Sequence, residues 1–175
     1  MLDFLSIVSN VGDDLGNPEL EWGRITIFLI LALGVSFLCS LLEAIILSVT
    51  WSHIEILSKE DRKSGKRLKE LKEDIDVPLA AILTLNTISH TIGAAGVGSE
   101  FNKLGNEWFT VASIILTILI LVFSEIIPKT LGAIYWKKWA PSSAYLLDAM
   151  IWITWPIVVV SVSYTHLTLP TNREV

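Results

Sequence analysis

FSEIIPK, residues 123–129, closes an apolar run that carries no other charge from Trp108 onward. Pro128 has no N–H to give the carbonyl of Ser124, and its ring displaces that carbonyl, so bare backbone oxygens are expected beside the Glu125 carboxylate. Inside a membrane such groups are tolerated only where protein buries them or where they line a wet cavity. An intramembrane carboxylate also indicates a functional site. We therefore expect a cation site with oxygen ligands at this helix end.

The composition indicates an integral membrane protein. Hydrophobic residues make up 52% of the 175 residues, and the mean hydropathy is +0.59. Charged residues account for 18%, which is below the roughly 25% usual for soluble domains. The length fits one domain. A single cysteine, Cys39, can form no internal disulfide and says nothing about the redox compartment.

Three stretches are apolar and long enough to cross a bilayer as helices: residues 25–49, 78–98 and 108–131. Glu43 is the only charge in the first, and Trp22 and Trp51 flank it as interfacial aromatics do. Pro78 opens the second, at a position that a helix N-terminus accepts. The predicted fold class is therefore all-α integral membrane, with three transmembrane helices.

The charge distribution predicts the orientation. Residues 52–76 hold seven of the thirteen Lys and Arg residues, which places this block in the cytoplasm as an amphipathic surface helix or helical pair. Residues 1–21 show no basic leader and no cleavage site, so we expect an extracytoplasmic N-terminal segment and not a cleaved signal peptide. Nucleic acid is not expected as a partner, because charge-mixed helices beside a membrane are mostly solvated.

Two C-terminal segments need separate interpretation. Residues 142–161 are apolar enough to span, but Asp148 and Pro156 within them also fit a bent helix in the interface. We favour the second alternative, a Pro-bent juxtamembrane or re-entrant helical belt. Residues 163–175 break every preceding pattern, and we expect them to be a non-native tail.

Polar side chains of all three predicted spans fall at one depth. Ser36, Ser40 and Glu43 are spaced i, i+4 and i+7, so they share one helix face. Glu43 lies roughly 10 Å, and Asn86 about 12 Å, from the cytoplasmic end of its own span at the rise of an α-helix. Glu125 falls at a similar depth. This agreement predicts a single site between the spans.

Hard oxygen donors dominate this set and suit Mg²⁺, Ca²⁺ or Mn²⁺, whereas zinc would require more than Cys39 and His90. Other roles stay open. Glu43 and Glu125 can be interhelical hydrogen-bonding groups, the serines can bond to carbonyls of their own helix, and His90 can be a structural donor. Small and polar residues share nearly one face of the second span and allow close helix packing: Asn86, Ser89, His90 and Gly93.

Three motifs resemble, in order and spacing, the transmembrane domain of the CNNM/CorC family, the magnesium-transporter and hemolysin-related CorC type. They are SLLEA at residues 40–44, LTLNT at 83–87 and SEIIPKTLG at 124–132. The likeness covers about residues 22–162. It implies three transmembrane helices with a Pro-bent juxtamembrane belt, usually a homodimer, followed by a cytosolic pair of CBS domains. It also implies Mg²⁺ transport, commonly discussed as export coupled to Na⁺.

The resemblance implies a set of metal-site positions, in which Ser40, Asn86 and Glu125 match the family's Mg²⁺ site and Glu43 stands beside Ser40. The full candidate set follows, with Pro128 as the helix break: Ser40, Glu43, Asn86, His90, Ser124 and Glu125. His90 stands where the family typically repeats an asparagine, and no CBS pair is present in this sequence.

A non-transporting membrane metal sensor or scaffold is the alternative function. An enzyme is not expected, because the sequence has neither a Gly-x-Ser-x-Gly elbow nor a His-Glu-x-x-His pair.

Overall fold

The computed structural model describes residues 21–60 and 63–168, with side chains through Pro156. Every element in these ranges is helical, and η marks a π-helical segment. In chain order they are α2 (Trp22–Leu29), η1 (Ile30–Val35), α3 (Ser36–Ser48), α4 (Trp51–Lys59), α5 (Lys63–Glu73), α6 (Asp76–Asn102), α7 (Asn106–Leu119), η2 (Ile120–Ile126) and α8 (Ile127–Thr168). Of the expected N-terminal segment 1–21, residues 1–20 lie outside the described residues; of the expected tail 163–175, residues 163–168 belong to α8 and residues 169–175 lie outside the described residues.

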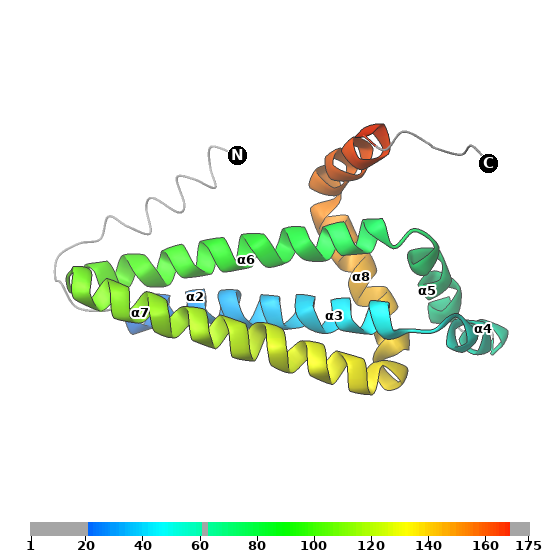
Figure 1. Ribbon diagram of the computed structural model, residues 1–175, viewed down its shortest axis with the longest axis horizontal. Helices are drawn as coiled ribbons and strands as arrows, with labels where there is room; N and C mark the ends of the chain where they lie inside the picture. The colour runs from blue at the N-terminus through cyan, green and yellow to red at the C-terminus, as the bar shows by residue number, and fades with distance from the viewer. Residues whose placement is uncertain (1–20, 61–62, 169–175) are drawn as a thin grey trace.

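Three helices have the length and hydropathy to cross a membrane: Trp22–Ser48, Asp76–Asn102 and the helix that begins at Asn106. They run side by side along the longest axis of the molecule (Figure 1). The first and third run in the same direction, and the second runs against them. The prediction of an all-α protein with three transmembrane helices is confirmed.

Glycines of α6 allow the first two spans to pack closely. A Cβ atom on Gly93 would lie 2.4 Å from the Cβ of Ala32, and one on Gly96 would lie 2.3 Å from the Phe28 ring. Real Cβ atoms do not approach so closely, so a methyl group at either position would force Ala32 or the Phe28 ring to shift. The small residues of this span therefore serve helix packing, as their pattern indicates.

The third span contains the π-helical segment η2 directly before Pro128. The N–H of Ile127 donates to the carbonyl of Val122, five residues back. Because Pro128 has no N–H and its ring crowds the preceding turn, a wider turn relieves that crowding. Pro128 is fully buried, so its effect on the backbone is exerted inside the protein.

Helix α8 contains the segment that is expected to form the juxtamembrane belt. After the third span it changes direction and crosses α3 and α6, with which it is in contact (Figure 1). It contains two prolines, Pro141 and Pro156, which are the usual cause of helix bends. Its inward face is a stripe of buried residues at helical spacing: Ala140, Ala144, Leu147, Ile151 and Thr154. Residues 142–161 therefore lie in α8 as a helix, while their position relative to the membrane stays a prediction.

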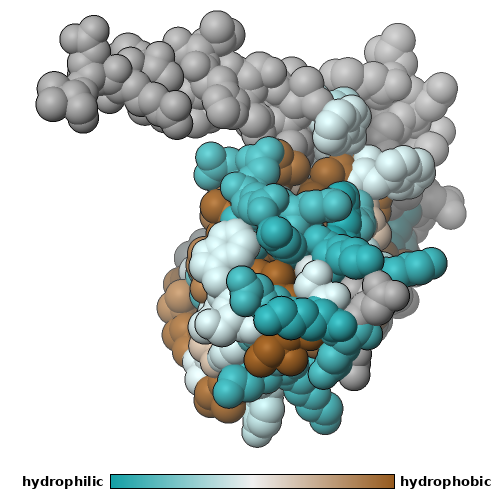
Figure 2. Space-filling model, turned by 90° about the vertical axis from the view of Figure 1, so that its right-hand side faces the viewer, coloured by the Kyte–Doolittle hydropathy of each residue, from teal (hydrophilic) through white to brown (hydrophobic). Residues whose placement is uncertain are grey.

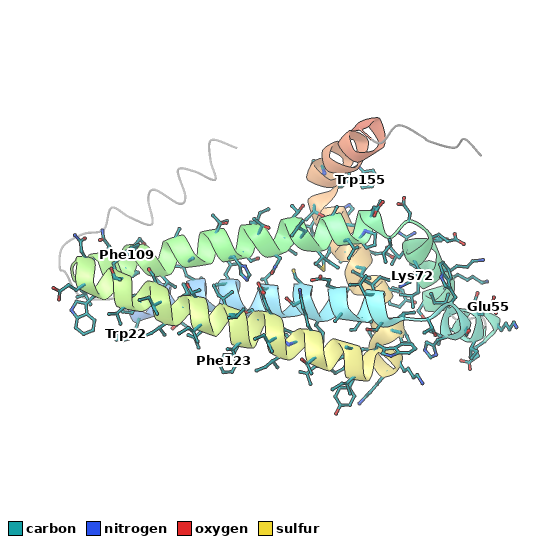
Figure 3. All side chains as sticks on the ribbon, in the orientation of Figure 1. Trp22, Glu55, Lys72, Phe109, Phe123 and Trp155 are labelled. Atoms are coloured by element: carbon teal, nitrogen blue, oxygen red, sulfur yellow. The ribbon has the colours of Figure 1, made fainter. Side chains whose placement is uncertain are left out.

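Helices α4 and α5 cover one end of the spans as the expected amphipathic pair. They bury Ile54, Leu57, Leu68 and Leu71 and leave charged residues outside, so this end of the molecule is mainly hydrophilic (Figure 2). Glu55 and Lys72 mark this end, while Trp22 lies at the opposite one (Figure 3).

Two side chains of α5 fasten the pair to the membrane domain. Lys72 Nζ donates to the carbonyl of Ile46 at 2.7 Å and so satisfies a carbonyl that the end of α3 leaves unpaired. Burial lowers the pKa of Lys72. Arg67 Nε lies 2.7 and 2.8 Å from the two carboxylate oxygens of Asp148 on α8. Hydrogen bonds to Asp148, and then to Glu70, raise the pKa of Arg67.

Candidate metal-binding site

The first two spans meet through a polar contact. His90 Nε2 lies 2.6 Å from Ser36 Oγ. Because α3 and α6 are antiparallel, one turn forward from Ser36 to Ser40 matches one turn back from His90 to Asn86. The structure thus brings Ser36 and His90 together and places Ser40 and Asn86 at one level, a turn nearer to the end covered by α4 and α5.

Two oxygens at this level have no hydrogen-bond partner. Within the described part of the chain, three buried side-chain N or O atoms lack a partner: Ser40 Oγ, Asn86 Oδ1 and His53 Nε2. The third belongs to α4, where the His53 ring meets the edge of Trp136. A buried polar atom without a partner costs about 1–3 kcal/mol. A bound cation would offset this cost at Ser40 and Asn86, so the donor set fits a metal ion.

The third span contributes Ser124 and Glu125. Ser124 is fully buried, and its hydroxyl donates to the carbonyl of Leu33 in η1 at 3.2 Å. The two π-helical segments therefore lie side by side. Because the first and third spans run in the same direction, this contact puts Glu125 near the level of Ser36. The Glu125 carboxylate is partly buried, and no described residue forms a hydrogen bond or ion pair with it.

Glu43 is placed differently from the other candidates. Lys129 Nζ lies 3.3 Å from Glu43 Oε2 and 3.5 Å from Oε1, so an ion pair ties the first span to the start of α8. The carboxylate lies about one turn past Ser40, toward the end of the span. The structure thus joins Glu43 to Lys129, whereas its proximity to Ser40 follows from helical spacing alone.

Sequence reasoning missed two members of this neighbourhood. One is Lys129, the partner of Glu43, for which the available signal in the sequence is a pair of opposite charges at the same end of two spans. The carbonyl of Leu33 was also missed, because no residue pattern in 30–35 indicates a π-helical segment. Ser89, by contrast, donates to the carbonyl of Leu85 in its own helix at 2.8 Å. This is the structural role that serines in helices often have.

The donors are hydroxyl, amide, carboxylate and backbone oxygens. Among the described residues no three or more His, Cys, Asp and Glu side chains gather into a group, so negative charge is sparse here. A site made mainly of neutral oxygens with one carboxylate suits hard cations such as Mg²⁺ or Ca²⁺.

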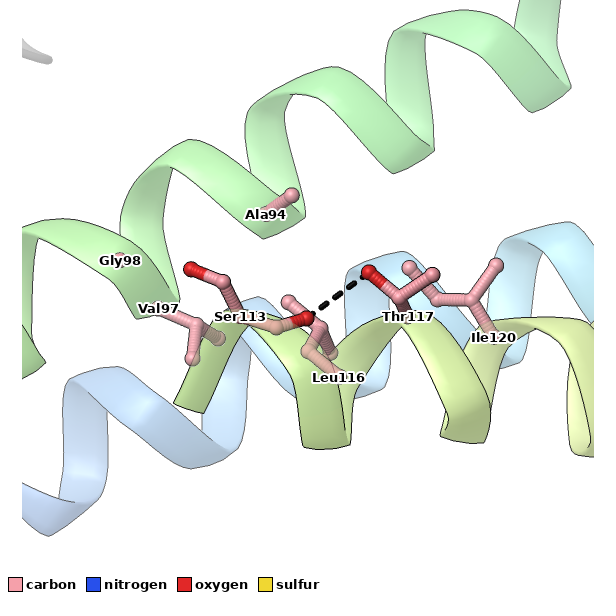
Figure 4. Close-up of a pocket in the computed structure, with 7 residues that line it drawn as sticks. All are labelled: Ala94, Val97, Gly98, Ser113, Leu116, Thr117 and Ile120. Atoms are coloured by element: carbon pink, nitrogen blue, oxygen red, sulfur yellow. Dashed lines mark hydrogen bonds between the residues drawn. The ribbon is translucent and has the colours of Figure 1, made fainter. Parts of the chain in front are cut away.

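A separate cavity of about 90 Å³ lies between α6 and α7 and contains none of these donors. Its lining residues are Ala94, Val97, Gly98, Ser113, Leu116, Thr117 and Ile120. The Thr117 hydroxyl donates to the carbonyl of Ser113 at 2.8 Å (Figure 4), and the Ser113 hydroxyl donates to Phe109 O at 2.8 Å. Both hydroxyls donate to carbonyls of their own helix, and no charged side chain lines the cavity, so it lacks the carboxylate of the candidate site.

Comparison with known proteins agrees with the fold. The family of the Cyclin M transmembrane N-terminal domain, CNNM, matches residues 26–173. This range includes residues 163–173, so the expected non-native tail stays a prediction.

Three relatives are similar to parts of the chain. A UPF0053 protein of Synechocystis is 40% identical over 110 residues, which is 62% of this chain and 31% of the relative. One from Haemophilus influenzae is 31% identical over 134 residues, 75% of this chain and 32% of the relative. The UPF0053 inner membrane protein YfjD of Escherichia coli is 29% identical over 103 residues, 58% of this chain and 24% of the relative.

The chain spans about a third of the length of these relatives, or less. Its three membrane-length helices and its similarity to an inner membrane protein make it an integral membrane protein. Because the family match covers nearly the whole sequence, the chain belongs to the CNNM transmembrane-domain family.

Proposed function

We propose that this chain is the ion-translocating part of a divalent-cation transporter that carries Mg²⁺ in exchange for Na⁺. The observation that carries the proposal is the pair of partnerless buried oxygens, Ser40 Oγ and Asn86 Oδ1, at one level of two neighbouring spans. Helix packing does not explain these two oxygens, since each costs free energy when it has no partner. Coordination of a transported cation would explain them.

Mg²⁺ gives up its water reluctantly and requires near-octahedral oxygen ligands. Ser40, Asn86 and Glu125 would replace part of its hydration shell, and the backbone oxygens beside Pro128 would add further donors. Glu125 would supply the negative charge, because the remaining donors are neutral. Membership of the CNNM family supports Mg²⁺ as the cargo over Ca²⁺, whose ligand chemistry is similar.

The proposed orientation follows from charge. Residues 52–76, which include α5 and nearly all of α4, hold seven of the thirteen Lys and Arg residues. They face the cytoplasm under the positive-inside rule, so the N-terminus lies outside. Mg²⁺ would enter from the end covered by α4 and α5. Movement of the second and third spans against the first would expose it outward, and Na⁺ would compete at the same oxygens. A homodimer and cytosolic CBS domains elsewhere in the full-length protein belong to this proposal.

The experiment is Mg²⁺ flux in proteoliposomes under an imposed Na⁺ gradient. Glu125→Gln keeps the shape of the side chain and removes its charge, so flux should fall to the level of empty vesicles. The matched control is Glu107→Gln, the same change at an exposed position in the first turn of α7, which should leave flux unchanged. Equal flux from both variants would refute the assignment of Glu125. Absence of flux, together with Mg²⁺ binding that depends on Glu125, would instead support a metal sensor.

A further inference from the structure

Helix α8 presents a stripe of unused hydrogen-bond donors on its outer face. Lys138, Ser142 and Tyr145 are spaced i, i+4 and i+7, so they share one face of the helix, and all three are exposed. None of them has a hydrogen-bond or ion-pair partner among the described residues. We call these three residues the donor stripe. The opposite face of the same segment is the buried stripe that packs on the spans.

Lys137 adds a second unpaired positive charge beside the donor stripe. Its ammonium lies 5.5 Å from the centre of the Trp136 ring and has no carboxylate partner in the described part of the chain. Four other basic side chains at this end are engaged: Arg67 with Asp148, Lys69 with Glu73, Lys72 with helix carbonyls and Lys129 with Glu43. The region around Lys137 and Lys138 therefore has uncompensated positive charge.

Aromatic side chains place this region at the membrane surface. Tyr135 and Trp139 stand one turn apart with ring centres 5.6 Å from each other, and Tyr135 is 49% exposed. Farther along the outer face, Trp152 is 81% exposed. Tyr and Trp prefer the headgroup level of a bilayer, and α8 crosses the spans instead of running along them (Figure 1). The stripe and its lysines therefore lie where lipid phosphates are found.

We propose that Lys137 and the donor stripe bind the phosphate of an anionic phospholipid. The phosphodiester offers acceptor oxygens to the ammonium of Lys138 and to the hydroxyls of Ser142 and Tyr145, and its charge complements the two lysines. The exposed apolar residues farther along α8 contact the acyl chains. This lipid site is independent of the cation site, because it lies on the outer face of α8 and shares no residue with it.

The test measures lipid retention by native mass spectrometry. The full chain in neutral detergent is offered equal amounts of phosphatidylglycerol and phosphatidylcholine with the same acyl chains, and the wild type should retain mainly phosphatidylglycerol. Each basic residue near an anionic surface raises the affinity for an anionic lipid about fivefold. Lys137→Gln/Lys138→Gln should therefore lower the ratio of retained phosphatidylglycerol to phosphatidylcholine by about 30-fold. Loss of preference in the variant, with the wild type preferring phosphatidylglycerol, would support the site.

The matched control is Lys59→Gln/Lys63→Gln, which removes the same charge from exposed positions of α4 and α5 and should keep the preference. Tyr145→Phe removes only a hydroxyl and should weaken the preference for phosphatidylglycerol by a smaller factor than the double lysine variant. This second variant keeps the test valid if the double lysine variant cannot be purified. An equal loss in the control would show nonspecific charge attraction and overturn the proposal. Displacement of the lipid by excess inorganic phosphate would overturn it as well, because the site would then recognise a free anion.

Discussion

Replacing Ser40 by alanine should stabilise the metal-free protein and weaken its response to Mg²⁺. Ser40 is 1% exposed, and its hydroxyl oxygen has no partner among the described residues. Alanine removes that oxygen and adds no bulk, so the helix contact itself is preserved. The two effects have opposite signs, which distinguishes a ligand from an ordinary core serine.

The magnitude follows from the burial of the hydroxyl. A desolvated hydroxyl without a partner costs about 1–3 kcal/mol, so the metal-free variant should gain about 1 kcal/mol after the small lost packing is subtracted. For a chain of this size that is about 2–4 °C in Tm. A ligand present at a hundred times its Kd stabilises the folded state by about 2.7 kcal/mol. A tenfold weaker site would lose about 1.4 kcal/mol of that gain.

The assay is thermal unfolding in detergent, with EDTA and then across an Mg²⁺ titration. Ser143→Ala is the matched control, since Ser143 is also 1% exposed but its hydroxyl already donates to the carbonyl of Ala140 at 2.8 Å. The control should gain nothing in EDTA and should keep the full Mg²⁺ shift. The reasoning fails if Ser40→Ala lowers the metal-free Tm and still shows the wild-type Mg²⁺ shift.

Three further changes test other parts of the structure by the same unfolding assay. Gly96→Ala should cost about 1–3 kcal/mol, because the new methyl group would lie 2.3 Å from the Phe28 ring; an unchanged Tm would mean that the spans are not packed this closely. Asp148→Asn should cost about 1 kcal/mol, since the bidentate contact with Arg67 is partly exposed and therefore weak; a loss of several kcal/mol would contradict that. His90→Asn adds an amide oxygen at the level of Ser36, one turn from Asn86, and should strengthen Mg²⁺ binding because Mg²⁺ prefers oxygen ligands; an unchanged Mg²⁺ titration would make His90 a bystander.

The sequence could predict the features that depend on the length of an apolar run and on the spacing of residues along a helix. The three spans follow from apolar runs, and the belt follows from Asp148 and Pro156 in an otherwise apolar stretch. The common depth of Ser40 and Asn86 follows from the fixed rise per residue of a helix. These features need no knowledge of how the helices are rotated against one another.

Pairings between helices could not be predicted in this way. Which face of α6 meets the first span depends on the close approach of Gly93 and Gly96 to α2 and η1, and the same rotation of α6 brings His90 to Ser36. The π-helical segments change the helical phase by part of a turn and leave no mark on the hydrophobic pattern. Thus the candidate residues could be found from spacing, while their partners required the structure.

The Glu43–Lys129 ion pair bears on how a transported ion could leave. If Glu43 were not paired, its carboxylate, one turn beyond Ser40, would add a second negative charge near the proposed site and favour tighter binding. The Lys129 ammonium, 3.3 Å from Glu43, compensates this charge and leaves a single net negative charge for the proposed site. Affinity at oxygen sites rises with the number of charged ligands, so compensation by Lys129 favours weaker binding and faster release. Under the proposed function, the lysine of the motif that decides the fold thus keeps the site weak enough for transport.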